Sequence, residues 1–397
     1  MMTTRHIGYV PGSKLQTLSL FEVVRILVVA LALACLVAAA PLARPAHAAT
    51  TFTVDRTDDP DPMTANACTA DPNDCSLRGA IVAANAATGA DTISVPEGTY
   101  TLTRAGAEED AASTGDLDVT GELTITGAGA RTMSVVGGAA PFDDRIFDNL
   151  PGVKTTITGL TITGGKTFAG GVQNQGDLTL REVTVKGNTG NGNGVGGIFG
   201  RGGTLNLIDS TVSGNSAPSI GGLYQLGGVA NITNSTISSN KTTSQAGFSS
   251  GVVADEAALV NIRNSTIVSN ESARLGGGIL TSTGTTVLVK NTIVAGNSQD
   301  NCDTAQFGGA ISSQGNNISS DDSCNFTQPT DKRNTNPRLG PLTNNGGPTD
   351  THALLKRSPA INAGGAPFPT TDQRGVTRPQ GSASDIGAFE KQKKKKK

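Results

Sequence analysis

The sequence of 397 residues predicts an all-β protein, folded as a right-handed single-stranded parallel β-helix of roughly nine coils with irregular capping segments at both ends. Three observations predict it. An asparagine recurs once per repeat unit, apolar residues alternate with a period of two inside each unit, and paired glycines mark a further bend. Because no repeat shows the 3.6-residue period of an α-helix, stacked short strands are favoured over helical repeats.

The recurring asparagines set the register of the repeats. They follow one another at intervals of 27, 25, 30 and 27 residues, and each stands three residues after a Val or Ile: Asn188, Asn215, Asn240, Asn270 and Asn297. Positions eight and ten residues before each asparagine are apolar as well. This alternation, broken once, indicates two short strands that meet at a corner.

The corner position, six residues before each asparagine, is polar in every unit: Glu182, Asp209, Asn234, Asn264 and Asn291. Asparagine tolerates left-handed backbone geometry, and stacked amides hydrogen-bond along a column. We therefore expect two structural ladders, one at each bend. The apolar register extends the β-helix over residues 91–325.

Composition supports a thin aliphatic core, with 51 Gly, no Trp and 4% aromatic residues. Disorder is the competing interpretation of so glycine-rich a chain. A disordered segment, however, does not keep an apolar register across five units. Paired glycines precede an apolar residue in most units, as in Gly196-Gly197-Ile198, and open the third bend.

The first 48 residues have the pattern of a signal peptide. Basic residues precede an apolar run over residues 26–40, and Ala46-His47-Ala48 supplies the small residues of a cleavage site. The alternatives are an uncleaved anchor, for which this run is short, and a lipoprotein modified at Cys35. We expect a secreted, extracellular or cell-surface protein.

Four cysteines remain after residue 48, in two local pairs at the two ends of the repeats: Cys68 with Cys75, and Cys302 with Cys324. An even number in an exported chain predicts disulfides. A metal site is the alternative, but the one histidine beyond residue 48, His352, lies far from both pairs in the sequence.

Charge is unevenly distributed. Residues 49–390 carry 21 basic and 32 acidic side chains, whereas residues 391–397 form a lysine-rich tail. The acidic body predicts no nucleic-acid partner. The tail is either a solvated end or an electrostatic attachment to an anionic envelope polymer. We expect no transmembrane anchor in the mature chain.

Both ends resemble bacterial surface proteins. Residues 75–81, CSLRGAI, are similar to the motif of the CSLREAI-domain proteins, within an N-terminal cap over residues 49–90. From Asn336 the chain reads NPRLGPLTNNGGPTDTHALLKRSPAINAG, which resembles the choice-of-anchor Q domain and assigns residues 326–390 to it. The repeats resemble polymorphic outer-membrane-protein and pectate-lyase-like β-helices. The resemblance implies an exported surface protein whose partner is a cell-surface polysaccharide or an envelope polymer.

Catalytic candidates are few. A hydrolase needs paired carboxylates, and Glu182 and Asp209 share the corner position one coil apart. A lyase needs a basic residue near an acidic sugar, and Arg263 is the candidate, in an outward column with Arg181 and Lys290. The competing interpretations are acidic members of the corner ladder and a solvated basic face.

Asp116 and Asp118 alternate on one strand face and are candidate Ca²⁺ ligands, although no glycine-turn loop accompanies them. We otherwise expect no cofactor. The leading interpretation is an adhesin-like or scaffold protein without catalysis. The alternative is a pectate-lyase-like polysaccharide lyase or a glycoside hydrolase that acts on an acidic polysaccharide.

Overall fold

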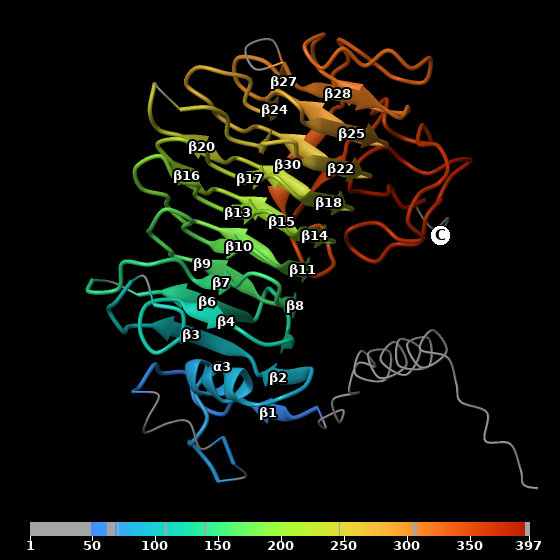
Figure 1. Ribbon diagram of the computed structural model, residues 1–397. Coiled ribbons are helices and arrows are strands. Elements are labelled where there is room, and N and C mark those ends of the chain that lie inside the picture. The colour runs from blue at the N-terminus through green and yellow to red at the C-terminus, as the bar shows by residue number, and fades with distance from the viewer. Residues whose placement is uncertain are drawn as a thin grey trace, which may run out of the picture. The chain divides into compact units, whose positions relative to one another are not determined.

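The computed structural model describes residues 49–61, 68–69, 71–107, 109–138, 140–245, 247–304 and 308–393. They belong to one compact unit, Ala48–Lys397. Its chain winds through three long parallel sheets of ten, eight and nine strands (Figure 1). The expected signal peptide, residues 1–48, and the last four residues of the lysine-rich tail lie outside the described residues.

Each complete coil contributes one strand to each sheet in turn. The ten-stranded sheet contains β1 (Thr51–Thr53), β2 (Asp91–Val95), β5 (Leu123–Gly127), β8 (Lys154–Thr158), β11 (Asp177–Arg181), β14 (Thr204–Ile208), β18 (Val229–Thr233), β22 (Leu259–Arg263), β25 (Thr286–Lys290) and β28 (Ala310–Ser313). The nine-stranded sheet contains β3 (Gly98–Leu102), β6 (Met133–Gly137), β9 (Thr161–Thr163), β12 (Thr184–Lys186), β15 (Thr211–Ser213), β19 (Thr236–Ser238), β23 (Thr266–Val268), β26 (Ile293–Ala295) and β29 (Ile318–Ser319).

The eight-stranded sheet contains β4 (Leu117–Val119), β7 (Phe147–Asn149), β10 (Val172–Asn174), β13 (Ile198–Arg201), β17 (Leu223–Leu226), β21 (Val252–Asp255), β24 (Ile279–Thr281) and β27 (Cys302–Asp303). Two small sheets complete the described part. They are β16 (Ser216–Ala217) with β20 (Lys241–Thr242), and the antiparallel pair β30 (Leu339–Thr343) and β31 (Thr351–Leu354). The predicted parallel β-helix is confirmed. The eight-stranded sheet allows at most eight coils that contribute to all three sheets, slightly fewer than the nine expected.

The interior is filled by aliphatic columns that follow the strand register. Leu178, Leu205, Ala230, Val260 and Val287 stack from coil to coil, and all five are fully buried. The side chains of a strand alternate between its two faces. The residues next to these core positions in each strand therefore point outward. The apolar period of two seen in the sequence therefore corresponds to the core of the β-helix.

The asparagine ladder is present as a continuous hydrogen-bonded column. The Nδ2 atom of each asparagine from Asn188 to Asn270 donates to the Oδ1 atom of the next at 2.9–3.0 Å. The same Oδ1 atom also accepts the backbone N–H of the preceding ladder residue. Asn297 continues the column by donating to Asn301, a residue that the repeat did not reveal.

The second column is a set of left-handed corners with fewer mutual contacts. All five residues have φ between 48° and 54°. Asn234 donates to Asp209 at 3.1 Å and Asn291 donates to Asn264 at 3.4 Å. The Oδ1 atom of Asn234 and the Nδ2 atom of Asn264 have no hydrogen-bond partner. This column is thus an interrupted ladder, whose first role is to turn the backbone.

The N-terminal cap contains the helix α3 (Leu77–Ala86), which the prediction of an irregular cap did not anticipate. Ser76 caps it by accepting the backbone N–H of Gly79. Arg78 is buried, and its guanidinium forms an ion pair with Asp59 at 2.6 Å. It also donates to four backbone carbonyls of the loop before β4, those of Ala112, Thr114, Gly115 and Asp116. The arginine of the CSLRGAI motif therefore fastens the cap to the first coil.

Both predicted disulfides are present. Cys68 is bonded to Cys75, and Cys302 to Cys324. The first bond lies beside helix α3, and the second joins β27 to the loop that follows β29. Each therefore fixes one end of the stack, where strand edges lack a neighbouring coil.

Residues 336–390, here named the C-terminal strap, run back along the coils (Figure 1). Gln373 donates to the backbone carbonyl of Ser210 and accepts from the hydroxyl of Thr236. Nearer the start of the strap, Asp350 forms an ion pair with Arg131 at 2.7 Å. The strap thus covers the outer face of the nine-stranded sheet over several coils. No helix among the described residues is long and apolar enough to cross a membrane.

His352 in β31 is one of the buried contacts of the strap. Its Nδ1 donates to the carbonyl of Gly340 at 2.8 Å, and its Nε2 lies 2.9 Å from the hydroxyl of Ser238 in β19. Burial lowers the pKa of His352, and the hydrogen bond to Gly340 opposes that shift. The neutral imidazole is therefore the form that docks.

The midpoint of thermal unfolding should fall as the pH drops below the ordinary histidine pKa of about 6.5. In that range the unfolded chain binds a proton at His352 that the folded chain does not bind, so acidification favours unfolding. Thermal unfolding of wild type and His352→Gln between about pH 8 and 5 measures this contribution. The variant should show the smaller decrease. Equal decreases in the two proteins would contradict the assignment.

Candidate functional site

The outer face of the eight-stranded sheet carries acidic, aromatic and aliphatic side chains in one column. The strand register places one outward residue per coil in a single column: Asp118, Asp148, Gln173, Phe199, Tyr224, Val253, Leu280 and Asp303. The column is acidic at its N-terminal end and aromatic or aliphatic in the middle. Two candidate sites follow from it, an apolar groove and an acidic cluster.

The apolar groove has a volume of about 440 Å³. Phe199 and Tyr224 stack with ring centroids 5.4 Å apart, and Phe168 meets Phe199 edge to face at 5.5 Å. Phe168 and Phe248 are 41% and 40% exposed. Their rings therefore offer apolar surface to a ligand, whereas Phe199 is a buried support.

Part of the groove lining is polar. The hydroxyl of Tyr224 donates to Asp255 Oδ2 at 3.1 Å, and the hydroxyl of Ser282 donates to Asp255 Oδ1. Burial raises the pKa of Tyr224, and the negative charge of Asp255 adds to that shift. Tyr224 is thus a neutral phenol. Among the described residues, the lining of the groove contains no Lys or Arg.

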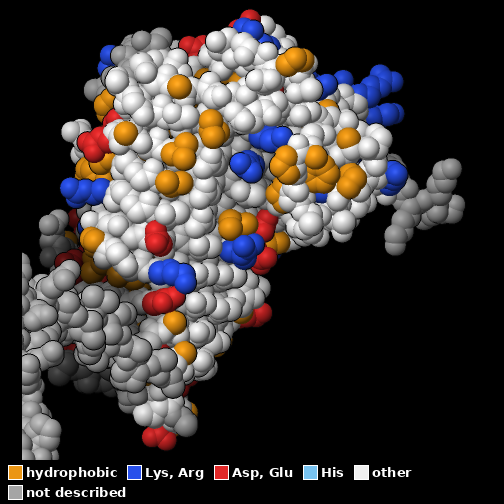
Figure 2. All heavy atoms as spheres, turned by 45° about the vertical axis from the view of Figure 1, so that its right-hand side comes forward, with side chains coloured by type: hydrophobic (Ala, Val, Ile, Leu, Met, Phe, Trp, Pro, Cys, Tyr) orange, Lys and Arg blue, Asp and Glu red, His pale blue; other side chains and the backbone are white. Residues whose placement is uncertain are grey.

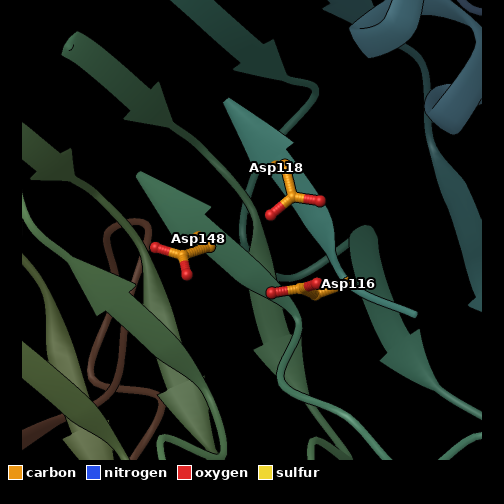
Figure 3. A group of neighbouring side chains, drawn as sticks. All are labelled: Asp116, Asp118 and Asp148. Carbon is orange, nitrogen blue, oxygen red and sulfur yellow. The ribbon is translucent and has the colours of Figure 1, made fainter. Parts of the chain in front are cut away.

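The acidic cluster combines the two predicted Ca²⁺ candidates with a third carboxylate. Asp116, Asp118 and Asp148 each place one oxygen so that all three atoms lie within 4.8 Å of one another (Figure 3). Asp118 and Asp148 occupy neighbouring strands, and Asp116 stands where the chain enters β4. Arg145 is the nearby cation, with Nη1 bonded to Asp148 and Nε 3.4 Å from Asp116 Oδ2.

The carboxyl groups of this cluster are shifted toward their protonated forms. Burial raises the pKa of Asp116 to about 9, with further increases from the charges of Asp118 and Asp144 and an opposing effect of Arg145. Burial also raises the pKa of Asp118 to about 7, against a hydrogen bond from the backbone of Ala112. The environment therefore favours a species that cancels negative charge, either a proton or a metal cation.

The predicted carboxylate pair, Glu182 and Asp209, lies at two successive corners. Burial raises the pKa of Asp209 to about 6, whereas the hydrogen bond from Asn234 and the charge of Arg181 lower it. Arg181 forms an ion pair with Asp209 Oδ2 at 3.3 Å. Thr349 of the strap donates to the backbone carbonyl of Asp209. Asp209 therefore has the contacts of a structural corner residue that binds the C-terminal strap.

The predicted basic column is interrupted. Arg263 stands opposite Lys290 of the next coil in the strand register. Ile208 and Thr233 occupy the same position in the two coils between Arg181 and Arg263. Lys290 donates to the carbonyl of Ala366 in the strap. Figure 2 shows a face on which charges of both signs are interspersed with uncharged surface. The structure therefore brings together two of the three basic residues expected in this column.

Asp148 and the groove aromatics were not among the predicted site residues. The signal for the aromatics lies after the paired glycines, where Ile198-Phe199 and Leu223-Tyr224 occupy the same place in successive units. The first member of each pair enters the core and the second points outward. Asp148 has the corresponding signal, since Phe147-Asp148-Asn149 repeats the pattern of Leu117-Asp118-Val119.

Among solved structures, the chain is similar to the crystal structure of pectate lyase Pel9A, with a TM-score of 0.53 and 17% sequence identity. The alignment covers 87% of this chain and 97% of that chain. No protein-family model matches the chain, and no curated protein matches it. The likeness confirms the right-handed pectate-lyase-like β-helix. The CSLREAI and choice-of-anchor Q resemblances remain expectations from the sequence.

Proposed function

We propose that this protein is a non-catalytic, exported β-helix protein that binds a polysaccharide along the outer face of its eight-stranded sheet. The observation that carries the proposal is the apolar groove, which the exposed rings of Phe168 and Phe248 line together with the hydrogen-bonding pair of Tyr224 and Asp255. Export rests on the signal-peptide pattern of residues 1–48. The lysine-rich tail then serves as an electrostatic attachment to an anionic envelope polymer.

The groove has the chemistry that a sugar chain requires. The C–H faces of a pyranose pack on aromatic rings, while its hydroxyl groups need fixed acceptors and donors. Phe168 and Phe248 supply the apolar contact, and Asp255 supplies an acceptor whose orientation Tyr224 and Ser282 fix. Because the groove lining comes from successive coils, from Phe199 to Leu280, a sugar chain laid along the groove would contact one coil after another.

Charge selects the kind of polysaccharide. Asp255 lines the groove, and no described Lys or Arg lines it with Asp255. A uronic-acid polymer would place its carboxylates beside this charge without a compensating cation. The groove is therefore suited to an uncharged glycan.

The alternative function, an enzyme, would use residues outside the groove. The pectate-lyase-like fold supports a lyase or hydrolase as a second candidate, with Glu182, Asp209 and Arg263 as its weak catalytic candidates. The contacts of Asp209 with Asn234, Arg181 and the strap favour a structural role for this corner. The proposal therefore assigns binding, and no turnover, to the protein.

Replacing Phe168 and Phe248 together by serine should weaken polysaccharide binding at least about tenfold, because both exposed rings lose their apolar contact with the sugar. Affinity electrophoresis and calorimetry with a panel of neutral and acidic polysaccharides would measure this. Leu259→Ser is the matched control, since Leu259 is 37% exposed on the ten-stranded sheet. It should bind as wild type does. Equal losses in both variants, or no binding by folded wild type, would overturn the proposal.

The same panel should show no release of reducing or unsaturated ends over prolonged incubation. Turnover that Asp209→Asn or Arg263→Ala abolishes would replace the binding proposal by the enzyme alternative. Both substitutions lie away from the residues that line the groove, so their effect on binding separates the two functions.

A further inference from the structure

The acidic cluster is an observation independent of the groove. Asp116, Asp118, Asp144 and Asp148 have relative exposures of only 2%, 1%, 1% and 2%. Buried carboxylates are normally compensated by donors or cations, because removing a charge from water is costly. Four of them in one place therefore need a specific explanation.

Compensation inside the protein is incomplete. The Oδ2 atoms of Asp116 and Asp144 and the Oδ1 atom of Asp148 are buried without a hydrogen-bond partner. Arg145 is the cation that pairs with them, through Nη1 to Asp148 and Nε toward Asp116 at 3.4 Å and Asp144 at 3.7 Å. Among the described residues, the guanidinium of Arg145 forms ion pairs with three of the four carboxyl groups, so the cluster has room for a second positive charge.

We propose that Asp116, Asp118 and Asp148 bind one Ca²⁺ ion that fastens the first two coils of the β-helix to each other. Ca²⁺ takes oxygen ligands at about 2.3–2.6 Å, so two of its ligands lie up to about 5 Å apart. The three carboxylate oxygens, all within 4.8 Å of one another, meet that limit. Mg²⁺ requires a near-ideal octahedron at about 2.0–2.1 Å and loses its water reluctantly, so three carboxylates held by the protein frame suit Ca²⁺ better.

The position of the site gives the ion a structural role. Asp118 lies in β4 and Asp148 in β7, so an ion between them joins two successive coils. Asp116 ends the loop whose carbonyls Arg78 of helix α3 holds. The ion would therefore act with Arg78 to fix the junction between the cap and the β-helix. It needs no polysaccharide, and its test is separate from that of the proposed function.

The site borders the groove through one residue. Gln173 donates to Asp148 Oδ2 at 2.7 Å and stands between Asp148 and Phe199 in the outward column. Asp148 is thus held from both sides, by Arg145 and by Gln173. Its remaining oxygen is the one without a hydrogen-bond partner, and it is available to a metal ion.

The probe is Ca²⁺ alone, added to the full mature chain after treatment with a chelator. Equilibrium dialysis with metal analysis should find one ion per protein, and Ca²⁺ should raise the midpoint of thermal unfolding by a few degrees over the chelated sample. Mg²⁺ at the same concentration should raise it less. Faster proteolysis of the loop before β4 in the chelator would report the loosened junction.

Asp118→Asn is the diagnostic variant, because asparagine keeps an oxygen for the backbone N–H of Ala112 while removing the charge. It should bind Ca²⁺ at least about tenfold more weakly. Asp322→Asn is the matched control at an exposed carboxylate and should behave as wild type does. Unchanged affinity in Asp118→Asn would place the ion elsewhere. No binding by folded wild type at millimolar Ca²⁺ would mean that protons neutralise the cluster, and either result overturns the proposal.

Discussion

Replacing Asn240 by leucine should lower the free energy of unfolding by about 2–6 kcal/mol. The Oδ1 atom of Asn240 accepts both the backbone N–H and the side-chain Nδ2 of Asn215, so leucine leaves two buried donors unpaired. It also removes the donor to Asn270 Oδ1 and to the carbonyl of Val212. Each unpaired buried group costs about 1–3 kcal/mol. Denaturant unfolding monitored by circular dichroism would measure the loss.

The matched control for this experiment is Asn231→Leu in the same coil. Asn231 belongs to a further, outward-facing amide ladder, with Asn206 before it and Asn261 after it. Its side chain is only half-buried, so water replaces the lost hydrogen bonds. The control should cost less than about 1 kcal/mol. Equal effects of the two replacements would show that the inner ladder has no special stabilising role.

Replacing Arg78 by alanine should destabilise the N-terminal cap by about 3–5 kcal/mol, because it leaves the carboxylate of Asp59 buried without its cation. The side chains of Arg78 and Asp59 are 0% and 3% exposed. Arg78→Lys should recover only part of the loss, since an ammonium cannot span Asp59 and four carbonyls as the guanidinium does. Hydrogen exchange in α3 and in the loop before β4 would locate the effect.

Arg56→Ala serves as the control for Arg78. Arg56 also pairs with an aspartate of the cap, but the side chain of that partner, Asp58, is 60% exposed. A surface pair of this kind contributes at most about 1 kcal/mol. If hydrogen exchange in the cap were as fast in Arg56→Ala as in Arg78→Ala, the buried ion pair would not be what holds the cap.

The repeats could be predicted from the sequence because their stabilising contacts are between equivalent residues of neighbouring coils. Asn215 contacts Asn188 and Asn240, so a fixed spacing along the chain becomes a contact in space. The disulfides could also be predicted, because the two cysteines of each pair are close together in the sequence. The left-handed corners at Asn234, Asn264 and Asn291 were equally predictable, because Asn tolerates that geometry better than most residues with a side chain, whereas Glu182 adopts it without such a preference.

The contacts outside the repeats could not be predicted in this way. Gln373 bonds to Ser210 across 163 residues, and no periodicity indicates that pairing. Asp118 was identified by alternation on its own strand, whereas Asp148 joins it only through the stacking of β7 on β4. Phe199 is one of 11 Phe residues in the sequence. Its role in the groove depends on Tyr224 standing at the same place in the next coil.

The C-terminal strap sets the order in which the molecule is completed. The coils stack on their predecessors, so they are able to assemble in sequence as the chain emerges from the ribosome. The strap reaches back from β31 to Arg131, and Gly365 closes on Asn291 only when the last coils are in place. Until then the outer face of the nine-stranded sheet stays uncovered. The strap therefore makes contacts that need stacked coils, and we expect a chain interrupted before residue 336 to form coils and leave that face uncovered.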